Sequence, residues 1–252
     1  MVTARFHFHH ELNEFVARSQ RGRTFECACP PTSSTKHMIE ALGVPHTEVD
    51  LILRNGHPTG FDAQIQPGDL IEVYPPHRAP PGMADGSLLL RAPMKAADLR
   101  FIADAHLGGL AQLLRLGGFD TRFDNNFADD AIERLAQEES RIVLTRDREL
   151  LKRRAVLRGC YVRALQPDEQ WREVAERLDL APHLRAFRLC LMCNAPLRPA
   201  AADEIDRRVP DGVRQRHTRF VTCDVCHRVF WEGSHWKRMR ARIDALAEAA
   251  QA

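Results

Sequence analysis

Long hydrophobic runs are absent from this sequence of 252 residues. No stretch approaches the roughly 20 consecutive apolar residues that a membrane-spanning helix requires. The opening residues, MVTARFHFHHELNEF, also contain no apolar segment like the middle part of a secretory signal peptide. We therefore expect a cytoplasmic protein that has no membrane partner.

A strong net charge is also absent, because the formal net charge is only +2. The charges are nevertheless distributed unevenly. Lys and Arg outnumber Asp and Glu by eight to two in residues 140–163 and by nine to three in residues 207–240. Basic segments beside a group of carboxylates suit a polyanionic substrate. The alternative is that each basic segment is a solvated helix face.

Cysteine is scarce, with seven residues in the chain, and four of them form two Cys-X-X-Cys pairs. Cys190 and Cys193 make the first pair, Cys223 and Cys226 make the second, and 29 residues lie between the pairs. Two such turns can place four thiolates around a tetrahedral Zn²⁺ and leave no open coordination position. We therefore expect a structural zinc site in a zinc ribbon. A redox dithiol is the alternative, but the presence of two pairs argues against it.

The middle of the chain alternates short apolar runs with helical patterns. The apolar runs predict buried strands at residues 99–103, 119–123, 142–144 and 160–165. The apolar spacing between them predicts helices at residues 107–116, 128–136 and 150–156, followed by a connecting helix at residues 167–183. Strands that alternate with helices indicate an α/β fold, in which a parallel sheet is covered by helices on both faces.

Aspartates follow several of these predicted strands. Asp104 comes directly after the first of them and Asp147 shortly after the third, where ligands bind in open parallel sheets. Asp124, Asp129 and Asp130 follow another strand. Carboxylate oxygens suit Mg²⁺ or Mn²⁺, and such ions activate water and stabilise a leaving oxygen in phosphodiester hydrolysis. The alternative is that these residues only cap or complement the helices that follow them.

Three arginines near the predicted edge could contact a substrate backbone. Arg115 lies on the first helix of this region, and Arg146 and Arg148 flank Asp147. Ordinary surface salt bridges are an equally good explanation for each of them. The adjacent glycines Gly108 and Gly109 sit inside the same first helix, which indicates a close approach of its backbone either to the sheet or to a phosphate.

The N-terminal residues 1–78 form a strand-helix-strand-strand pattern that ends in LILRNGHPTGFDAQIQPGDLIEVYPP. This phrase resembles ubiquitin-like β-grasp domains of the sulfur-carrier type. Those carriers end in Gly-Gly, whereas this chain continues through a Pro/Gly-rich linker at residues 79–97. We therefore expect a docking role toward a protein partner or a structural role. Cys27 and Cys29 have no second pair nearby and are expected not to bind metal.

The motifs FIADAHLGGLAQLLRLGGFDT, RIVLTRDRELLKR, CLMCNAPL and CDVCHRVFWEGSHW together resemble the Mut-seven C-terminal RNase domain family. The resemblance implies a PIN-like ribonuclease core at residues 98–183 and a zinc ribbon with a basic C-terminal helix at residues 184–252. It also implies a catalytic Mg²⁺ or Mn²⁺ held by Asp104, Asp147 and an intermediate acid, for which Asp130 is preferred over Asp124 and Asp129.

Two hypotheses for the function follow. The first is a metal-dependent ribonuclease that acts on structured RNA, with tRNA or rRNA as possible substrates. In it, Arg115, Arg146 and Arg148 contact phosphates, and the ribbon binds RNA. The second is a non-catalytic RNA- or ribosome-binding adaptor in which the carboxylates are helix caps. A phosphatase or receiver-like domain is a weaker third reading, because no motif indicates phosphotransfer.

Overall fold

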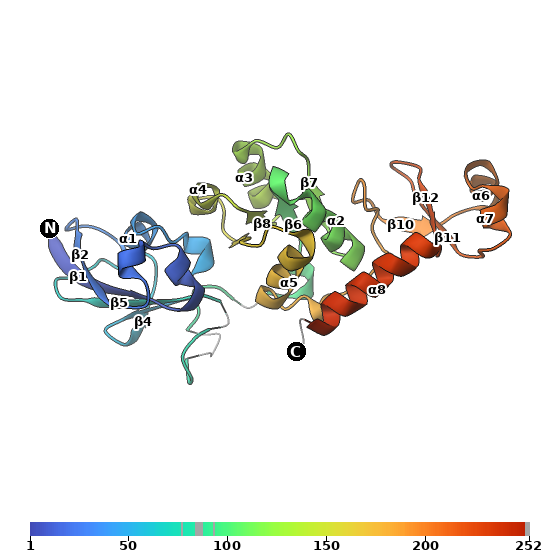
Figure 1. The fold of residues 1–252 in the computed structure, drawn as a ribbon. Coiled ribbons are helices and arrows are strands. Elements are labelled where there is room, and N and C mark those ends of the chain that lie inside the picture. The colour runs from blue at the N-terminus through green and yellow to red at the C-terminus, as the bar shows by residue number, and fades with distance from the viewer. Residues whose placement is uncertain (77, 84–87, 93, 250–252) are drawn as a thin grey trace.

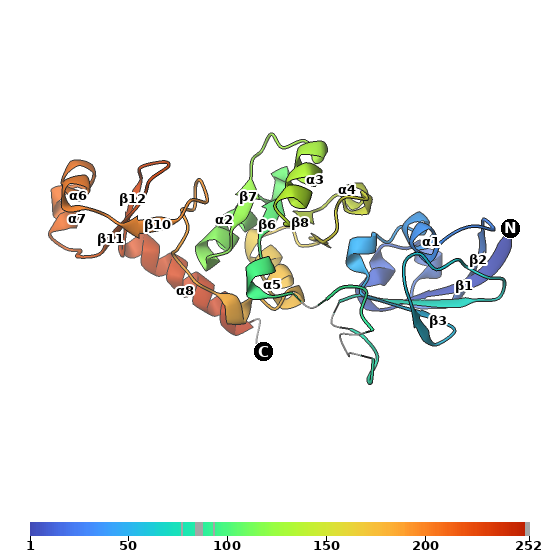
Figure 2. The same ribbon diagram turned by 180° about the vertical axis from the view of Figure 1, so that it is seen from behind.

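The computed structural model describes residues 1–76, 78–83, 88–92 and 94–249. Three sheets follow one another along the molecule, and Figure 1 shows the unit around each sheet in chain order from the N-terminus. The view from behind in Figure 2 shows the same sequence of units. The expected linker, residues 79–97, includes residues 84–87 and 93, which lie outside the described residues, as do residues 250–252 at the end of the expected ribbon.

The first unit is a β-grasp domain with a five-stranded sheet in the order β2-β1-β5-β3-β4. Its strands are β1 (Val2–Phe8), β2 (Phe25–Cys29), β3 (Leu51–Arg54), β4 (His57–Thr59) and β5 (Leu70–Tyr74). Its helices are α1 (Thr35–Ala41) and the 3₁₀ turns η1 (His10–Glu14), η2 (Arg18–Gln20) and η3 (His46–Glu48). The central strands β1 and β5 run parallel. Alternate residues of β1 (Ala4, Phe6 and Phe8) are buried in the core with Ile39 of α1, which fixes the helix over one face of the sheet.

The central unit is the predicted parallel α/β fold, with strand order β7-β6-β8-β9. Its strands are β6 (Phe101–Ala103), β7 (Thr121–Phe123), β8 (Ile142–Thr145) and β9 (Gly159–Tyr161). Its helices are α2 (Gly108–Gly117), α3 (Asp129–Glu138), α4 (Arg148–Lys152) and α5 (Pro167–Arg177), with the 3₁₀ turns η4 (Ala96–Asp98), η5 (Ala105–Leu107) and η6 (Ala181–His183). Several elements are shorter than predicted, because apolar residues such as Leu99 and Val162 continue the core beyond the hydrogen-bonded ladder.

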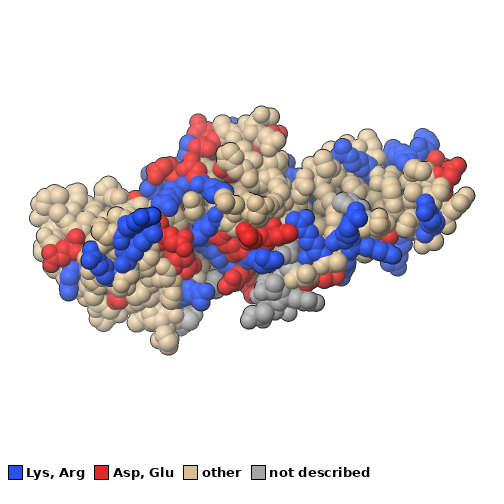
Figure 3. Space-filling view, in the orientation of Figure 1, with Lys and Arg blue, Asp and Glu red and all other residues tan. Residues whose placement is uncertain are grey.

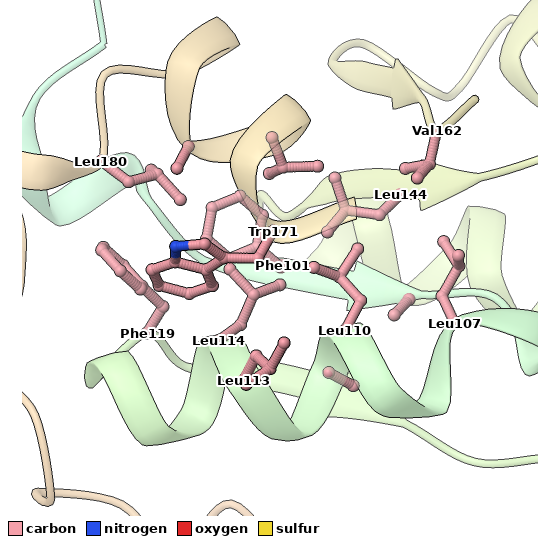
Figure 4. Close-up of a cluster of buried hydrophobic side chains, with 14 of the residues drawn as sticks. Phe101, Leu107, Leu110, Leu113, Leu114, Phe119, Leu144, Val162, Trp171 and Leu180 are labelled. Atoms are coloured by element: carbon pink, nitrogen blue, oxygen red, sulfur yellow. The ribbon is translucent and has the colours of Figure 1, made fainter. Parts of the chain in front are cut away.

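Helices cover both faces of this sheet, as alternating side-chain directions require. Phe101 and Leu144 point to one face, where they pack with Leu114 of α2 and Trp171 of α5 (Figure 4). Ile102 and the rest of a smaller cluster, drawn mainly from α3 and α4, cover the other face. The central strands β6 and β8 are therefore buried on both sides, which explains their largely apolar sequences.

Close packing explains why two glycines, Gly108 and Gly109, stand at the start of α2. A Cβ atom at Gly108 would lie 2.7 Å from a ring carbon of Phe123, and one at Gly109 would lie 2.6 Å from the ring of Pro167. The close approach is thus to the sheet and to α5. The helix ends where expected, since Gly118 takes the left-handed conformation at φ 93° that terminates α2.

The third unit is a three-stranded antiparallel ribbon, in the order β10-β11-β12. It contains β10 (Leu197–Pro199), α6 (Ala202–Arg208), α7 (Asp211–Arg214), β11 (Phe220–Cys223), β12 (Val229–Trp231) and α8 (Ser234–Ala249). Figure 1 shows α8 running from the ribbon back beneath the central unit. Its Ile243 is buried in the central core, so α8 fastens the ribbon to the α/β sheet. No helix in the described part of the chain combines the length and apolar character needed to cross a membrane.

The first unit is docked on the central unit through buried polar contacts. The Glu48 carboxylate is completely buried; it accepts from the Tyr161 backbone N–H at 2.7 Å and from Arg177 at 2.8 Å. His46 Nε2 lies 3.0 Å from the carbonyl oxygen of Val156. The guanidinium of Arg148 stands 4.9 Å from the centre of the Phe15 ring. These contacts hold the first unit close to the loop that leaves β8.

Candidate functional site

Asp104 and Asp147 lie at the same edge of the central sheet. Asp104 follows β6 directly, and Asp147 comes two residues after the end of β8. The two strands are parallel neighbours, with Ala103 opposite Leu144. The Asp104 backbone N–H extends this ladder by donating to the Leu144 carbonyl oxygen at 3.0 Å. Parallel pairing therefore brings together two aspartates that are far apart in sequence.

Thr145 links the two aspartates. Its side chain is completely buried, and its hydroxyl donates to Oδ2 of Asp104 at 2.8 Å. The hydroxyl oxygen of Thr145 also accepts the backbone N–H of Asp147 at 2.9 Å. A single hydroxyl thus fixes the Asp104 carboxylate and the chain direction at Asp147. Sequence reasoning missed this role, although Thr145 immediately precedes the Arg-Asp pair in the quoted motif.

Both aspartates also cap helices, as the alternative reading expects. Oδ1 of Asp104 accepts from the Ala105 N–H at 2.5 Å, and Oδ1 of Asp147 accepts from the Glu149 N–H at 2.8 Å. A carboxylate has about four acceptor positions, so these bonds leave oxygen lone pairs for another partner. Asp104 is half-buried and Asp147 is exposed. Capping therefore orients the two carboxylates and leaves some of their oxygen lone pairs free to bind another partner.

The other acidic candidates are engaged elsewhere. Asp130 pairs with Arg153 at 2.5 Å, and Asp129 pairs with the same arginine at 3.3 Å. Asp124 accepts the backbone N–H of Asn126 in a local turn. The structure therefore does not bring Asp130 together with Asp104 and Asp147 in a compact three-carboxylate group. Within the described ranges, the four-cysteine cluster is the one set of three or more potential ligand groups with all donor atoms within 4.8 Å of one another.

The three predicted substrate arginines have different surroundings. Arg115 is only 4% exposed, and it donates to the carbonyl oxygens of Thr121, Leu191 and Met192. The prediction that Arg115 contacts substrate is therefore corrected: this side chain joins α2 to the cysteine loop. Arg148 donates to the Phe15 carbonyl oxygen and serves the docking of the first unit. Arg146 is exposed beside Asp147 and has no ion pair among the described residues.

The four cysteines gather at one point between the two turns. Sγ of Cys190 lies 3.5 Å from Sγ of Cys226, and Sγ of Cys193 lies 3.3 Å from Sγ of Cys223. Thiolates bound to one tetrahedral Zn²⁺ at about 2.3 Å are separated by similar distances, so the donor set fits zinc. Cys27 and Cys29 are not part of this cluster.

The thiol environments differ within the cluster. Burial raises the pKa of the Cys190 thiol to about 12. Burial also acts to raise the pKa of Cys226, but hydrogen bonds from the Arg228 backbone N–H and from neighbouring thiols outweigh it and lower this pKa to about 7. A bound cation is therefore needed to hold all four groups as thiolates near neutral pH.

A polar network anchors the cysteine loop to the start of β7. Asn194 donates to the Asp120 carboxylate at 2.5 Å and accepts the Thr121 backbone N–H at 3.0 Å. Arg141 completes the network with two hydrogen bonds of 2.9 Å to the Asp120 carboxylate. This anchor lies at the amino edge of the sheet, opposite Asp104. Sequence reasoning missed it, and the only indication was the position of Asn194 directly after the first cysteine pair.

The fold comprises an α/β domain with a parallel sheet, preceded by a β-grasp domain and followed by a four-cysteine ribbon. The chain belongs to the Mut7-C RNAse domain family, whose sequence model matches residues 99–243, and the Mut7-C ubiquitin model matches residues 1–80. The resemblance found in the motifs is thereby confirmed, and the family indicates a ribonuclease-type function.

Two solved structures of the small archaeal modifier protein 1 of Haloferax volcanii are similar to part of this chain. They are 16% and 15% identical to it, cover 30% and 31% of this chain and 99% of their own, and have TM-scores of 0.25. No curated protein matches the chain.

Proposed function

We propose that this protein is a metal-dependent ribonuclease that hydrolyses phosphodiester bonds in RNA, with Asp104 and Asp147 as its catalytic metal ligands. The supporting observation is that the Thr145 hydroxyl connects these two strand-end aspartates. Neighbouring parallel strands bring the residues to the edge where open α/β sheets bind ligands. The family match supplies the ribonuclease class.

The oxygen donors at this edge suit a hard divalent cation, Mg²⁺ or Mn²⁺. Such an ion, when bound, activates water and stabilises the leaving oxygen of the phosphodiester. Thr145 and the Ala105 N–H hold the Asp104 carboxylate in place, and the Glu149 N–H holds that of Asp147. Asp130 is left out of the proposed ligand set because Arg153 neutralises it.

The remaining parts of the chain support this role. We assign Arg146 to the substrate phosphates, because it is exposed and lies next to Asp147. A structural zinc ion occupies the four-cysteine cluster and keeps the ribbon folded. Cellular RNA such as tRNA or rRNA is the substrate class, in the cytoplasm, and the β-grasp domain offers a surface for a protein partner.

A non-catalytic RNA-binding adaptor is the second candidate. The observation that favours it is that both edge aspartates cap helices, which gives each a purely structural role. In that case the carboxylates carry no ion, and the ribbon and β-grasp domain bind partners. The two candidates differ in whether divalent metal permits RNA cleavage.

The deciding experiment incubates the purified full-length chain with a tRNA transcript and Mn²⁺. Asp104→Asn and Asp147→Asn are each expected to slow cleavage by about 100-fold or more, because each removes a charged metal ligand. Asp62→Asn, which changes an exposed aspartate of the β-grasp domain, is the matched control and should cleave normally. Unchanged cleavage by both edge variants, or RNA binding without cleavage under any divalent ion, contradicts the ribonuclease proposal.

A further inference from the structure

The ribbon and α8 enclose an apolar groove that the proposed catalytic edge does not use. The groove has a volume of about 760 Å³ and is open to solvent. Aliphatic residues from β10 and α6 line part of it. Five aromatic side chains also line it: Phe187, Phe220, Phe230, Trp231 and Trp236. Only 7% of the residues in the whole chain are aromatic, so their concentration here sets the groove apart from the rest of the surface.

The aromatic rings are arranged so that flat ligands can stack on them. Phe187 and Trp236 are stacked on each other, with centroids 4.5 Å apart and planes inclined by 26°. Trp231 lies opposite Phe220 in the register of β11 and β12. Four of the five rings are only half-buried, Phe220 being the exception, so ring surface remains open to the groove.

The unit that contains the groove carries an excess of positive charge, whereas the two charged residues that line the groove itself, Arg219 and Glu232, are paired with each other at 3.9 Å. Residues 184–245 contain thirteen Lys and Arg but seven Asp and Glu. Every one of those seven carboxylates is within 4.0 Å of an arginine. Arg188, Arg228, Lys237 and Arg238 make no ion pair among the described residues, and Arg219 at the rim is 83% exposed. Figure 3 shows Lys and Arg spread along α8 and over the outer end of the ribbon.

We propose that this groove binds single-stranded RNA, with bases stacked on Trp231 and its aromatic neighbours and phosphates held by cations of the ribbon and α8. Aromatic platforms within a basic surface are how single strands are bound without sequence preference. A duplex fits poorly, because its bases are already stacked on each other. An apolar peptide would not use the excess of positive charge. The inference rests on the proposed function and adds a substrate form, a strand with unpaired bases.

The groove lies apart from the candidate cleavage edge. Arg115, near the end of α2, bonds the cysteine loop, whereas the start of α2 follows Asp104 closely. The ten residues of α2 span about 15 Å. A strand held in the groove must therefore extend along the central unit to reach Asp104 and Asp147, and a very short oligonucleotide cannot occupy both places.

Fluorescently labelled oligouridylate tests this proposal, with binding measured in buffer free of Mg²⁺ and Mn²⁺. Trp231→Leu, which keeps apolar bulk but removes the aromatic face, is expected to weaken binding about fivefold or more. Binding of a blunt-ended RNA duplex should change less than about twofold, because it inserts no base into the groove. Leu157→Ala, which changes an apolar residue 68% exposed on the central unit, is the matched control and should bind normally.

A second measurement remains decisive if Trp231→Leu disturbs the ribbon. In the wild-type chain, 4-thiouridine in the oligonucleotide should crosslink to the peptide that contains Phe230 and Trp231, and Phe230→Leu should weaken binding in the same way. Crosslinks confined to other segments overturn the proposal. The proposal is also overturned if Trp231→Leu binds RNA with unchanged affinity and converts a dimer of the chain into a monomer. That result would assign the groove to a second copy of the chain. Absence of cleavage by the wild-type protein overturns the ribonuclease function but leaves this binding result standing.

Discussion

Thr145 donates its hydroxyl hydrogen to Oδ2 of Asp104 across 2.8 Å, over a separation of 41 residues in the chain. The hydroxyl oxygen in turn receives the Asp147 N–H. Because the side chain of Thr145 is completely buried, water cannot replace it in either bond. The two proposed metal ligands therefore share one positioning group.

Thr145→Val should disturb this arrangement while keeping the shape of the side chain. The Asp104 carboxylate loses its donor, and the Asp147 N–H loses its acceptor. We expect RNA cleavage to fall by about 10- to 100-fold with a weaker apparent affinity for Mn²⁺, as is usual when a group that orients a metal ligand is removed. Cleavage rates over a series of Mn²⁺ concentrations measure this. Thr145→Ser keeps the hydroxyl and should restore most of the rate; equal losses in both variants would point to altered packing instead.

Removal of the ribbon metal should unfold the ribbon before the central unit. The wild-type chain is expected to contain one zinc ion, and Cys223→Ser should lose it, because four thiolates form the site. Zinc content by atomic absorption and the fluorescence of Trp231 and Trp236 report on metal and fold. Cys27→Ser lies in the β-grasp domain and should retain the metal. Retention of zinc by Cys223→Ser would exclude the proposed site.

Arg115 and Arg146 should respond in opposite ways to substitution by methionine. Arg115→Met removes buried charged donors from three carbonyl oxygens and should reduce the free energy of unfolding by about 3 kcal/mol. Arg146→Met should leave urea unfolding unchanged but raise the KM for RNA, because this arginine is exposed beside Asp147. A folded Arg115→Met with normal stability and weakened RNA binding would restore Arg115 as a substrate contact.

Asp120 should make part of the stability dependent on pH. Burial acts to raise its pKa, but hydrogen bonds from Arg141 and Asn194 outweigh burial, and the pKa is lowered from its ordinary value. A carboxyl with a lowered pKa in the folded state stabilises the protein above the unfolded-state pKa, and this stabilisation is lost as the pH falls below about 4. Asp120 is 37% exposed, so solvent screening limits the effect to about 1 kcal/mol. Urea unfolding at neutral and acidic pH should show a smaller loss on acidification for Asp120→Asn than for the wild type.

The sequence predicts the α/β core well because its central strands β6 and β8 are buried on both faces and its helices have apolar stripes. The strand-end positions of Asp104 and Asp147 follow from that alternation. The environment of Arg115 cannot be predicted from that alternation, because its partners Leu191 and Met192 lie more than 70 residues further along the chain. Arg148 likewise meets Phe15, which is 133 residues away. Such contacts depend on how separate units pack, and residue spacing within one unit contains no information about that packing.

The tie between Arg115 and the cysteine loop has a consequence for where cleavage can occur. A buried guanidinium bonded to three carbonyl oxygens prevents the ribbon from swinging independently of α2. The ribbon and the Asp104 edge are thus held at a fixed separation. Under the proposed ribonuclease function and groove, cleavage should fall at a fixed number of nucleotides from the bound bases, so the products from a uniform strand should share the same ends.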